Sequence, residues 1–376
     1  MNSLRNYLDR QKPKFEKGGK LEKLHSVFTG FESFLFVPNQ TTRSGAHIRD
    51  AVDLKRTMIM VVIALVPALL FGIYNVGYQH FNALDEMANA TFSKLFFYGL
   101  WKVVPMIVVS YVVGLGIEFA AAQIKGHEIN EGFLVSGLLI PLIMPVEAPL
   151  WMIALSTAFA VIIGKEIFGG TGMNIWNPAL LARAFFFFSY PSMISGDKVW
   201  VADMPDGYTQ ATPLAQMALG QPLSYSSADM FWGLIPGSVG ETSTFCVLIG
   251  AAIMLATNVA SWRIMLSVFA GGLLMGLAFQ PLTGVPAYDQ LLMGGFAFGA
   301  VFMATDPVTS SQTNTGKVIY GLLIGAMAVI IRCINPGYPE GMMLAILLMN
   351  TSAPLIDWLV VQANIKRRLK RAKAIV

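Results

Sequence analysis

Charged residues are scarce in this chain of 376 residues. Aspartate, glutamate, lysine and arginine together make up 13% of it, about half the usual fraction of a soluble domain, whereas hydrophobic residues make up 55%. A chain with so few charges cannot present a polar surface on all sides. The composition therefore excludes an ordinary water-soluble domain and indicates that lipid is the main solvent.

Cysteine and histidine are also rare. The two cysteines, Cys246 and Cys333, lie in apolar stretches without metal-ligand spacing, so we expect two small buried side chains. None of the four histidines pairs with another at helical spacing. The sequence therefore gives little support for a zinc or haem centre.

Positive charge gathers at both ends of the chain. The first 56 residues hold eleven of the 26 lysines and arginines, and the last eleven residues hold six. Because basic segments are enriched on the cytoplasmic side of membranes, both ends are predicted to be cytoplasmic. The first apolar segment begins only after Arg56, which argues against a cleavable signal peptide. We expect the basic ends to meet anionic membrane lipid and partner subunits, and expect no nucleic acid partner.

Ten apolar segments are candidates for crossing the bilayer, which takes about 20 residues. They lie at roughly 57–77, 95–122, 132–145, 149–168, 177–191, 243–259, 263–281, 291–305, 318–334 and 341–361. If they are threaded from a cytoplasmic N-terminus, the outer connections carry mostly acids: Asp85, Glu86, Glu147, Asp197, Asp203, Asp206, Asp229, Glu241, Asp289 and Glu340. The inner turns carry Lys125, Lys165, Arg263 and Lys317. This asymmetry favours an all-α membrane protein of ten spans with both termini inside.

The two halves of the chain resemble each other. Residues 132–145 and 295–307 are short apolar segments that begin with Gly-Phe and end with proline, and each precedes one span, an Asn-Pro turn and a further apolar run. Residues 53–60 also resemble residues 260–266. Five spans per half is an odd number, so two similar halves would cross the membrane in opposite directions, with a pathway at their interface. Chance similarity between apolar segments is the alternative.

This repeat divides the chain into five parts. The predicted parts are a cytoplasmic N-terminal segment (1–56), a first transmembrane repeat (57–191), an outer, periplasmic loop (192–242), a second transmembrane repeat (243–361) and a basic cytoplasmic tail (362–376).

A polar island lies in the predicted outer loop. Residues 206–214 read Asp-Gly-Tyr-Thr-Gln-Ala-Thr-Pro-Leu. They resemble the pattern Asp-x-x-Ser/Thr-Gly-Ala-Ser/Thr, whose last hydroxyl takes flavin mononucleotide (FMN) through a phosphoester bond. The match predicts FMN on Thr212, with Asp206 as a contact for the transferase, although Gln210 stands where the pattern has glycine. Without the pattern, Thr212 is an ordinary solvated loop residue.

Five charged residues fall within or at the end of apolar segments: Glu118, Arg183, Asp306, Arg332 and Asp357. Charges are costly in lipid, so such residues usually line a water-filled path or pair with one another. Carboxylates are suitable ligands for a hard cation such as Na+ that sheds its water. An ion path and structural ion pairs both remain open.

The two short segments also carry apolar ridges. Phe133, Val135 and Leu138 are expected to oppose Phe296, Phe298 and Phe302. Two such ridges would form a dry constriction that gates ions by excluding water. We therefore predict Val135, Leu138, Phe298 and Phe302 as gate residues. Ordinary packing between helices is the alternative.

Further runs of residues point to one family. They lie at 47–56, 130–133, 165–172, 174–180, 302–307 and 338–343, and so extend over nearly the whole chain. The chain resembles the NqrB subunits of the Na+-translocating NADH:quinone oxidoreductases, in the NqrB/RnfD family. The resemblance implies ten helices in two inverted halves, similar to urea channels. It also implies FMN on Thr212 and cation uptake or release at Glu118, Asp306 and Asp357.

The resemblance implies a second flavin, riboflavin, bound without a covalent bond near Asn174 and Asn177. Asparagine amides can both donate to and accept from the edge of an isoalloxazine ring. A helix start at Asn177-Pro178 after a glycine-rich turn is the alternative reading of the same residues.

The family further implies a bacterial inner-membrane complex of six subunits, in which the five others (A, C, D, E and F) would be partners of this chain. Electrons from NADH, which reacts on another polypeptide of the complex, would reach FMN, then riboflavin, then a quinone near the N-terminal segment, and Na+ would be the transported ion. The RnfD protein of the related Rnf complex is an alternative, against which the long segment 1–50 argues. A passive solute channel, which needs no flavin, is another.

Overall fold

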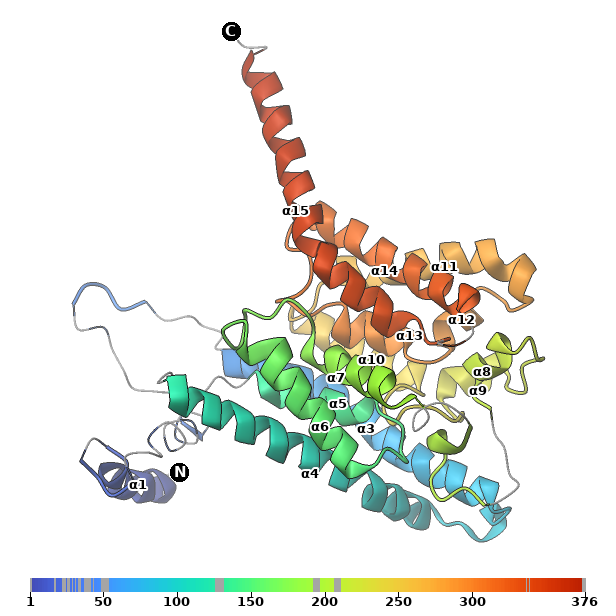
Figure 1. Cartoon of the computed structure of the whole chain (residues 1–376), viewed down its shortest axis with the longest axis horizontal. Coiled ribbons are helices and arrows are strands. Elements are labelled where there is room, and N and C mark those ends of the chain that lie inside the picture. The colour runs from blue at the N-terminus through green and yellow to red at the C-terminus, as the bar shows by residue number, and fades with distance from the viewer. Residues whose placement is uncertain are drawn as a thin grey trace.

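The computed structural model describes residues 2–16, 18–21, 44–48, 54–125, 132–191, 197–205, 211–335, 337 and 339–373, and isolated positions between 25 and 42. Every regular element within these residues is a helix, and none is a strand. The prediction of an all-α protein is confirmed. Figure 1 shows the helices packed into one body, from which α1 and the end of α15 extend.

The first half of the chain supplies α1 (Asn2–Gln11), η1 (Lys12–Lys14), α3 (Leu54–Ala83), η3 (Met87–Asn89), α4 (Phe92–Lys125), α5 (Phe133–Leu142), α6 (Leu150–Val161), the π-helix η4 (Ile162–Glu166) and α7 (Pro178–Ser189). Three short helices follow: η6 (Asp197–Trp200), α8 (Pro213–Ala218) and α9 (Ser227–Trp232). The second half supplies α10 (Thr244–Ala256), α11 (Trp262–Thr283), α12 (Asp289–Leu292), α13 (Phe296–Phe298), the π-helix η7 (Gly299–Met303), α14 (Asn314–Ile334) and α15 (Met342–Lys373).

Five of these helices are long and apolar enough to cross a membrane, namely α3, α4, α11, α14 and α15. They mark the chain as a membrane protein. The other predicted spans are shorter: α5, α6, α7 and α10 have 10 to 13 residues, and the segment 291–305 is broken into α12, α13 and η7. Hydropathy does not separate a full span from a short helix that neighbouring helices shield from lipid. The count of ten spans stays a prediction.

Small residues bring the long helices close together. A methyl group added at Gly77 of α3 or Gly99 of α4 would collide with the backbone of the other helix. The same holds for Gly271 of α11 and Gly325 of α14. Without a hydrophobic driving force inside lipid, such close backbone contact is a main source of helix association.

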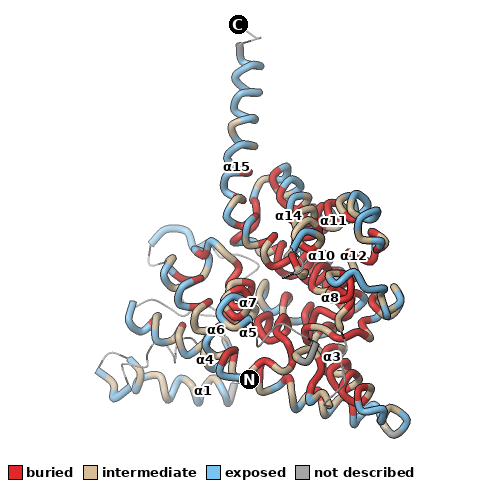
Figure 2. The backbone as a smooth tube through the Cα atoms, turned by 45° about the vertical axis from the view of Figure 1, so that its right-hand side comes forward, coloured by how far each residue is buried: buried red, intermediate tan, exposed pale blue. Residues whose placement is uncertain are grey.

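Each short segment packs against the long helix of its own half. Phe133, at the start of α5, covers Gly114 of α4, and Phe296, at the start of α13, covers Gly272 of α11. The expectation that Phe133 and Phe296 oppose each other is therefore wrong, because each ring is turned toward its own half. Both rings are fully buried, and Figure 2 shows that buried residues fill the middle of the body.

The prediction that both cysteines are buried is also wrong. Cys246 and Cys333 are free thiols of intermediate exposure. Apolar sequence neighbours did not distinguish a helix face that meets the core from one that meets lipid.

Candidate functional site

A cavity of about 320 Å³ opens where the second half of α7 meets α8 and the loop before α10. We call it the Thr212 cavity. Its polar lining includes Arg183, Thr212, Ser238, Glu241, Thr242 and Glu340, and its aromatic lining includes Phe186, Phe187 and Trp200. The predicted flavin anchor therefore faces a space with both charged and aromatic walls. Asp206, Thr209 and Gln210, the other informative positions of the motif, lie outside the described residues.

Thr212 is half-buried and is the N-cap residue of α8. Its backbone is extended, with φ −64° and ψ 155°, and its Oγ1 accepts a hydrogen bond of 3.2 Å from the backbone N–H of Ala215. Pro213 follows at the first helical position, where its missing N–H costs nothing. A cap needs the threonine oxygen only as an acceptor. The cap therefore does not depend on the hydroxyl hydrogen that a phosphoester would replace.

The charged groups of this cavity form a buried cluster. Arg183 of α7 donates to the Glu340 carboxylate at 2.6 Å and to the Ser238 hydroxyl at 3.1 Å, and it lies 3.5 Å from Glu241. Arg183 and Glu241 are 7% and 6% exposed. Glu241 and Glu340, which the charge pattern assigned to outer loops, thus pair with a buried arginine. The sequence did not reveal this pairing, because the partners are far apart in the chain.

These residues fit a bound FMN. The volume lies at the lower end of the range for small-molecule pockets, about 300–1,000 Å³. Aromatic rings on the wall can stack on a flavin ring, and Arg183 is a cation beside the space. The hydroxyl of Thr242, which also lines the cavity, is buried and has no hydrogen-bond partner among the described residues. A flavin can satisfy such a group.

A second, smaller cavity of about 100 Å³ lies at the beginning of α7, and we call it the Asn177 cavity. Its lining includes five of the predicted site residues: Val135, Asn174, Asn177, Phe302 and Asp306. Val135 and Asp306, which are 171 positions apart in the sequence, therefore meet at one cavity. Lys165 of η4 and Phe302 of η7 also line it, so both π-helices of the described chain border this cavity. Single turns of π-helix often occur at functional sites.

The asparagines of this cavity are engaged by the protein itself. The Asn177 side-chain oxygen accepts from the backbone N–H groups of Ala179 (3.0 Å) and Leu180 (3.3 Å), which caps α7. The Asn177 amide nitrogen donates to Asp306 at 3.2 Å, and the Asn174 amide nitrogen donates to the carbonyl of Trp176 at 3.0 Å. With these bonds and a volume of about 100 Å³, the cavity does not fit a whole riboflavin in this conformation.

Two carboxylates lie at or beside the Asn177 cavity. Asp306 accepts from Asn177 and, at 3.0 Å, from the backbone N–H of Val308, and it has no ion pair with a described lysine or arginine. Glu118 of α4 forms a buried ion pair with Lys165, and each is 5% exposed. Lys165, which was assigned to a cytoplasmic turn, is therefore inside the protein. The spacing of the two residues in the sequence did not predict that Lys165 pairs with Glu118.

Asp357 lies in neither cavity. Its carboxylate accepts from the hydroxyls of Ser311 and Thr313, both at 2.6 Å, and from the backbone N–H groups of Gln312 (2.7 Å) and Thr313 (2.9 Å). These bonds fix the loop before α14 to α15. Asp357 therefore has a structural role as the acceptor that holds this loop in place.

Three segments of the chain run from one cavity to the other. Along α7, Asn177 borders the smaller cavity and Phe186 the larger one; along α13 and η7, Gly295 borders the larger and Phe302 the smaller. Val135 of α5 borders the smaller cavity, and Met144, just after this helix, borders the larger one. Of the predicted gate residues, Leu138 and Phe298 line neither cavity and are 5% and 0% exposed. The rings of Phe298 and Phe302 are 4.9 Å apart.

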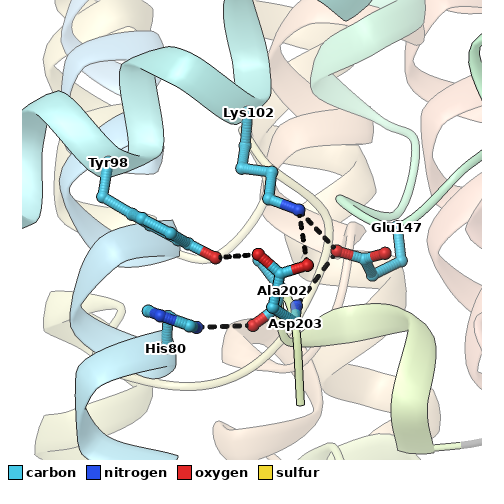
Figure 3. Close-up of polar contacts among 6 residues, drawn as sticks. All are labelled: His80, Tyr98, Lys102, Glu147, Ala202 and Asp203. Atoms are coloured by element: carbon cyan, nitrogen blue, oxygen red, sulfur yellow. Dashed lines mark hydrogen bonds and ion pairs between the residues drawn. The ribbon is translucent and has the colours of Figure 1, made fainter.

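A separate polar network anchors the segment before the Thr212 cavity (Figure 3). Lys102 of α4 bonds to Asp203 at 2.8 Å and to Glu147 at 3.2 Å, and Tyr98 donates to Asp203 at 2.6 Å. His80 of α3 bonds to the carbonyl of Ala202 at 2.8 Å. Hydrogen bonds from Lys102 and Tyr98 hold the pKa of Asp203 below its usual range, although burial acts in the opposite direction. The network fixes the backbone just after Trp200, a wall of the cavity.

The chain has close relatives among known proteins. The model of the NQR2, RnfD, RnfE family matches residues 41–366. A protein of Chromohalobacter salexigens, named as the B subunit of a Na(+)-translocating NADH-quinone reductase, is 48% identical over 401 aligned positions, which cover 99% of this chain and 97% of the relative. Proteins of the same name are each 45% identical in Stutzerimonas stutzeri, over 401 positions, and Klebsiella pneumoniae strain 342, over 413 positions; both cover 98% of this chain and 99% of the relative. The chain therefore belongs to the NQR2, RnfD, RnfE family.

Proposed function

We propose that this chain is the membrane subunit of a Na+-translocating NADH-quinone reductase that carries FMN on Thr212. The observation that carries the proposal is the position of Thr212 on the wall of a cavity of about 320 Å³ beside a buried arginine. The near-complete coverage of relatives with that enzyme name supports the reaction. The attached flavin supplies electron transfer. Arg183 and the aromatic wall would hold it, and α7 and α8 would border it.

The attachment can be tested directly. Denatured protein separated on a gel should fluoresce under ultraviolet light, because only a covalent bond retains a flavin under those conditions. Thr212→Ala should abolish the fluorescence. Thr209→Ala tests the neighbouring motif position, and Thr242→Ala tests another threonine of the same cavity; both should retain it. Fluorescence that persists in Thr212→Ala would place the flavin elsewhere.

The two halves of the chain are proposed to form an inverted repeat around the ion path. The packing of Phe133 on Gly114 matches that of Phe296 on Gly272, which pairs α4 with α11. The similarity of residues 53–60 to residues 260–266 would instead pair α3 with α11. The two alignments of the halves therefore differ by one helix. The path would run at the interface of the halves, where the predicted gate residues Leu138 and Phe298 would separate the cavities.

Na+ is the proposed cargo, and the Asn177 cavity is the proposed entry. Asp306 offers carboxylate oxygen there without a described cationic partner, as a hard cation requires. Glu118 is already neutralised by Lys165. In proteoliposomes, Asp306→Asn should therefore reduce Na+ uptake more than Glu118→Gln does. Uptake that is unchanged in both variants would remove these carboxylates from the path.

The remaining assignments follow the relatives. The proposed setting is the inner membrane of a bacterium, with both termini cytoplasmic, in a complex with other subunits and with quinone as the electron acceptor. Riboflavin near Asn174 and Asn177 stays a prediction, and it requires a wider Asn177 cavity than the one described. Asp357 and Val135 likewise stay predictions as parts of the ion path.

A further inference from the structure

The charge cluster of the Thr212 cavity has a composition that attachment of a flavin does not require. One guanidinium, that of Arg183, meets two carboxylates, those of Glu241 and Glu340. The side chains are 8%, 6% and 12% exposed, so little water screens them. All three groups line the cavity, and Arg183 is the only lysine or arginine among its described lining residues.

A fourth charge lies behind the wall. Arg332 of α14 is 1% exposed and donates to the backbone carbonyls of Glu340 and Met293, both at 3.3 Å, and of Gln290. It does not line the cavity. With all four side chains ionised, two cations balance two carboxylates. Any charge that appears in the cavity is then uncompensated and interacts strongly with its nearest fixed charges.

Reduction of a flavin creates such a charge. When the ring takes up two electrons and one proton, it carries one more negative charge than before. An arginine beside the ring favours this anion, and nearby carboxylates oppose it, in the same way that fixed charges shift a pKa. The balance between the two sets the midpoint potential of the flavin.

We infer that Arg183 stabilises the reduced, anionic flavin in the Thr212 cavity, and that Glu241 and Glu340 limit this effect by neutralising the guanidinium. The inference rests on the proposed attachment of FMN to Thr212. It assigns to the cluster the tuning of the flavin potential. Neutralising either glutamate raises the potential, and neutralising Arg183 lowers it.

The test is an equilibrium redox titration of the attached flavin, with dithionite as reductant, in the purified full-length chain. Glu241→Gln and Glu340→Gln keep the shape of each side chain and remove its charge. Each should change the ratio of reduced to oxidised flavin at least tenfold, which is an upward shift of about 30 mV for a two-electron couple. Glu86→Gln, which removes an exposed carboxylate that pairs with Lys94 and lines neither cavity, is the matched control and should leave the potential unchanged.

Arg183→Gln should shift the potential downward, whereas Arg183→Lys, which keeps the charge, should shift it less. If the arginine variants do not fold, the two glutamate variants still decide the question. A potential that stays the same or falls in both glutamate variants overturns the inference. Gel fluorescence separates this result from a failure of the proposed attachment: fluorescent protein with an unchanged potential refutes only the tuning, whereas wild-type protein without fluorescence refutes the attachment.

Discussion

The Thr212 cavity and the Asn177 cavity are joined by the same helices but differ in what their polar groups already do. In the smaller cavity, Asn177 is committed to a helix cap and to Asp306, and Lys165 is committed to Glu118. In the larger one, the Thr242 hydroxyl has no partner among the described residues and a guanidinium lies beside open space. The first arrangement suits the passage of a small ion, and the second suits a resident cofactor. The difference in volume agrees with this assignment, but the polar contacts explain it.

The largest effect is expected when the buried pair beside the Asn177 cavity loses one of its two charges. Lys165→Met removes the partner of Glu118, which is 5% exposed. Breaking a buried pair costs about 3–5 kcal/mol because the remaining charge is uncompensated. We expect a clearly lower midpoint of thermal unfolding in detergent. The double variant Lys165→Met, Glu118→Leu should recover most of the loss, and a loss that is equal in both variants would show that the pair is not the cause.

The predicted gate between the cavities can be tested by removing one of its buried rings. Phe298 is fully buried and its ring lies 4.9 Å from that of Phe302. Phe298→Ala leaves a void and should cost about 3 kcal/mol of stability. It should also raise passive Na+ leak in proteoliposomes without a reductant. Phe81→Ala, on α3, is a control that removes another buried ring, one that lines neither cavity, and an equal leak from it would contradict a gate at Phe298.

A smaller effect is expected from the cap of α7. Asn177→Ala removes the acceptor for two backbone N–H groups and should lower the unfolding free energy by about 1 kcal/mol. Asn177→Asp keeps the acceptor but places a second carboxylate beside Asp306. It should preserve the cap and alter the dependence of uptake on Na+ concentration. If the alanine variant is as stable as the wild type, the cap is not what Asn177 contributes.

The smallest effect is expected from the network of Figure 3. The pKa of Asp203 is lowered by hydrogen bonds from Lys102 and Tyr98, so the folded state binds a proton at this carboxylate more weakly than the unfolded state does. Its contribution to stability is present above the unfolded pKa of about 4 and is lost as the pH falls below it. Asp203→Asn should remove that acid-dependent part of the unfolding midpoint. Asp229→Asn, in the capping box at the start of α9, should not remove it.

The sequence predicted the apolar segments well because hydropathy and proline positions are local properties. It also placed Val135, Asn174, Asn177, Phe302 and Asp306 among the candidates, and the structure brings these five together. The ion pairs between charged residues were less predictable. Glu241 and Glu340 were read as loop acids, although both pair with Arg183 inside the protein. A partner 157 residues away leaves no periodic signal in the chain, and a short helix shielded by protein has the same hydropathy as one that meets lipid.

Helix α7 has one further consequence for the molecule. Its twelve residues make a stiff rod of about 18 Å, with Asn177 at one end and Arg183 and Phe186 farther along it. Because a helix barely shortens, an axial movement of one end displaces the other by the same amount. The arginine beside the proposed redox centre and the asparagine at the proposed ion entry are therefore linked by one rigid helix, and an axial shift of α7 would move both.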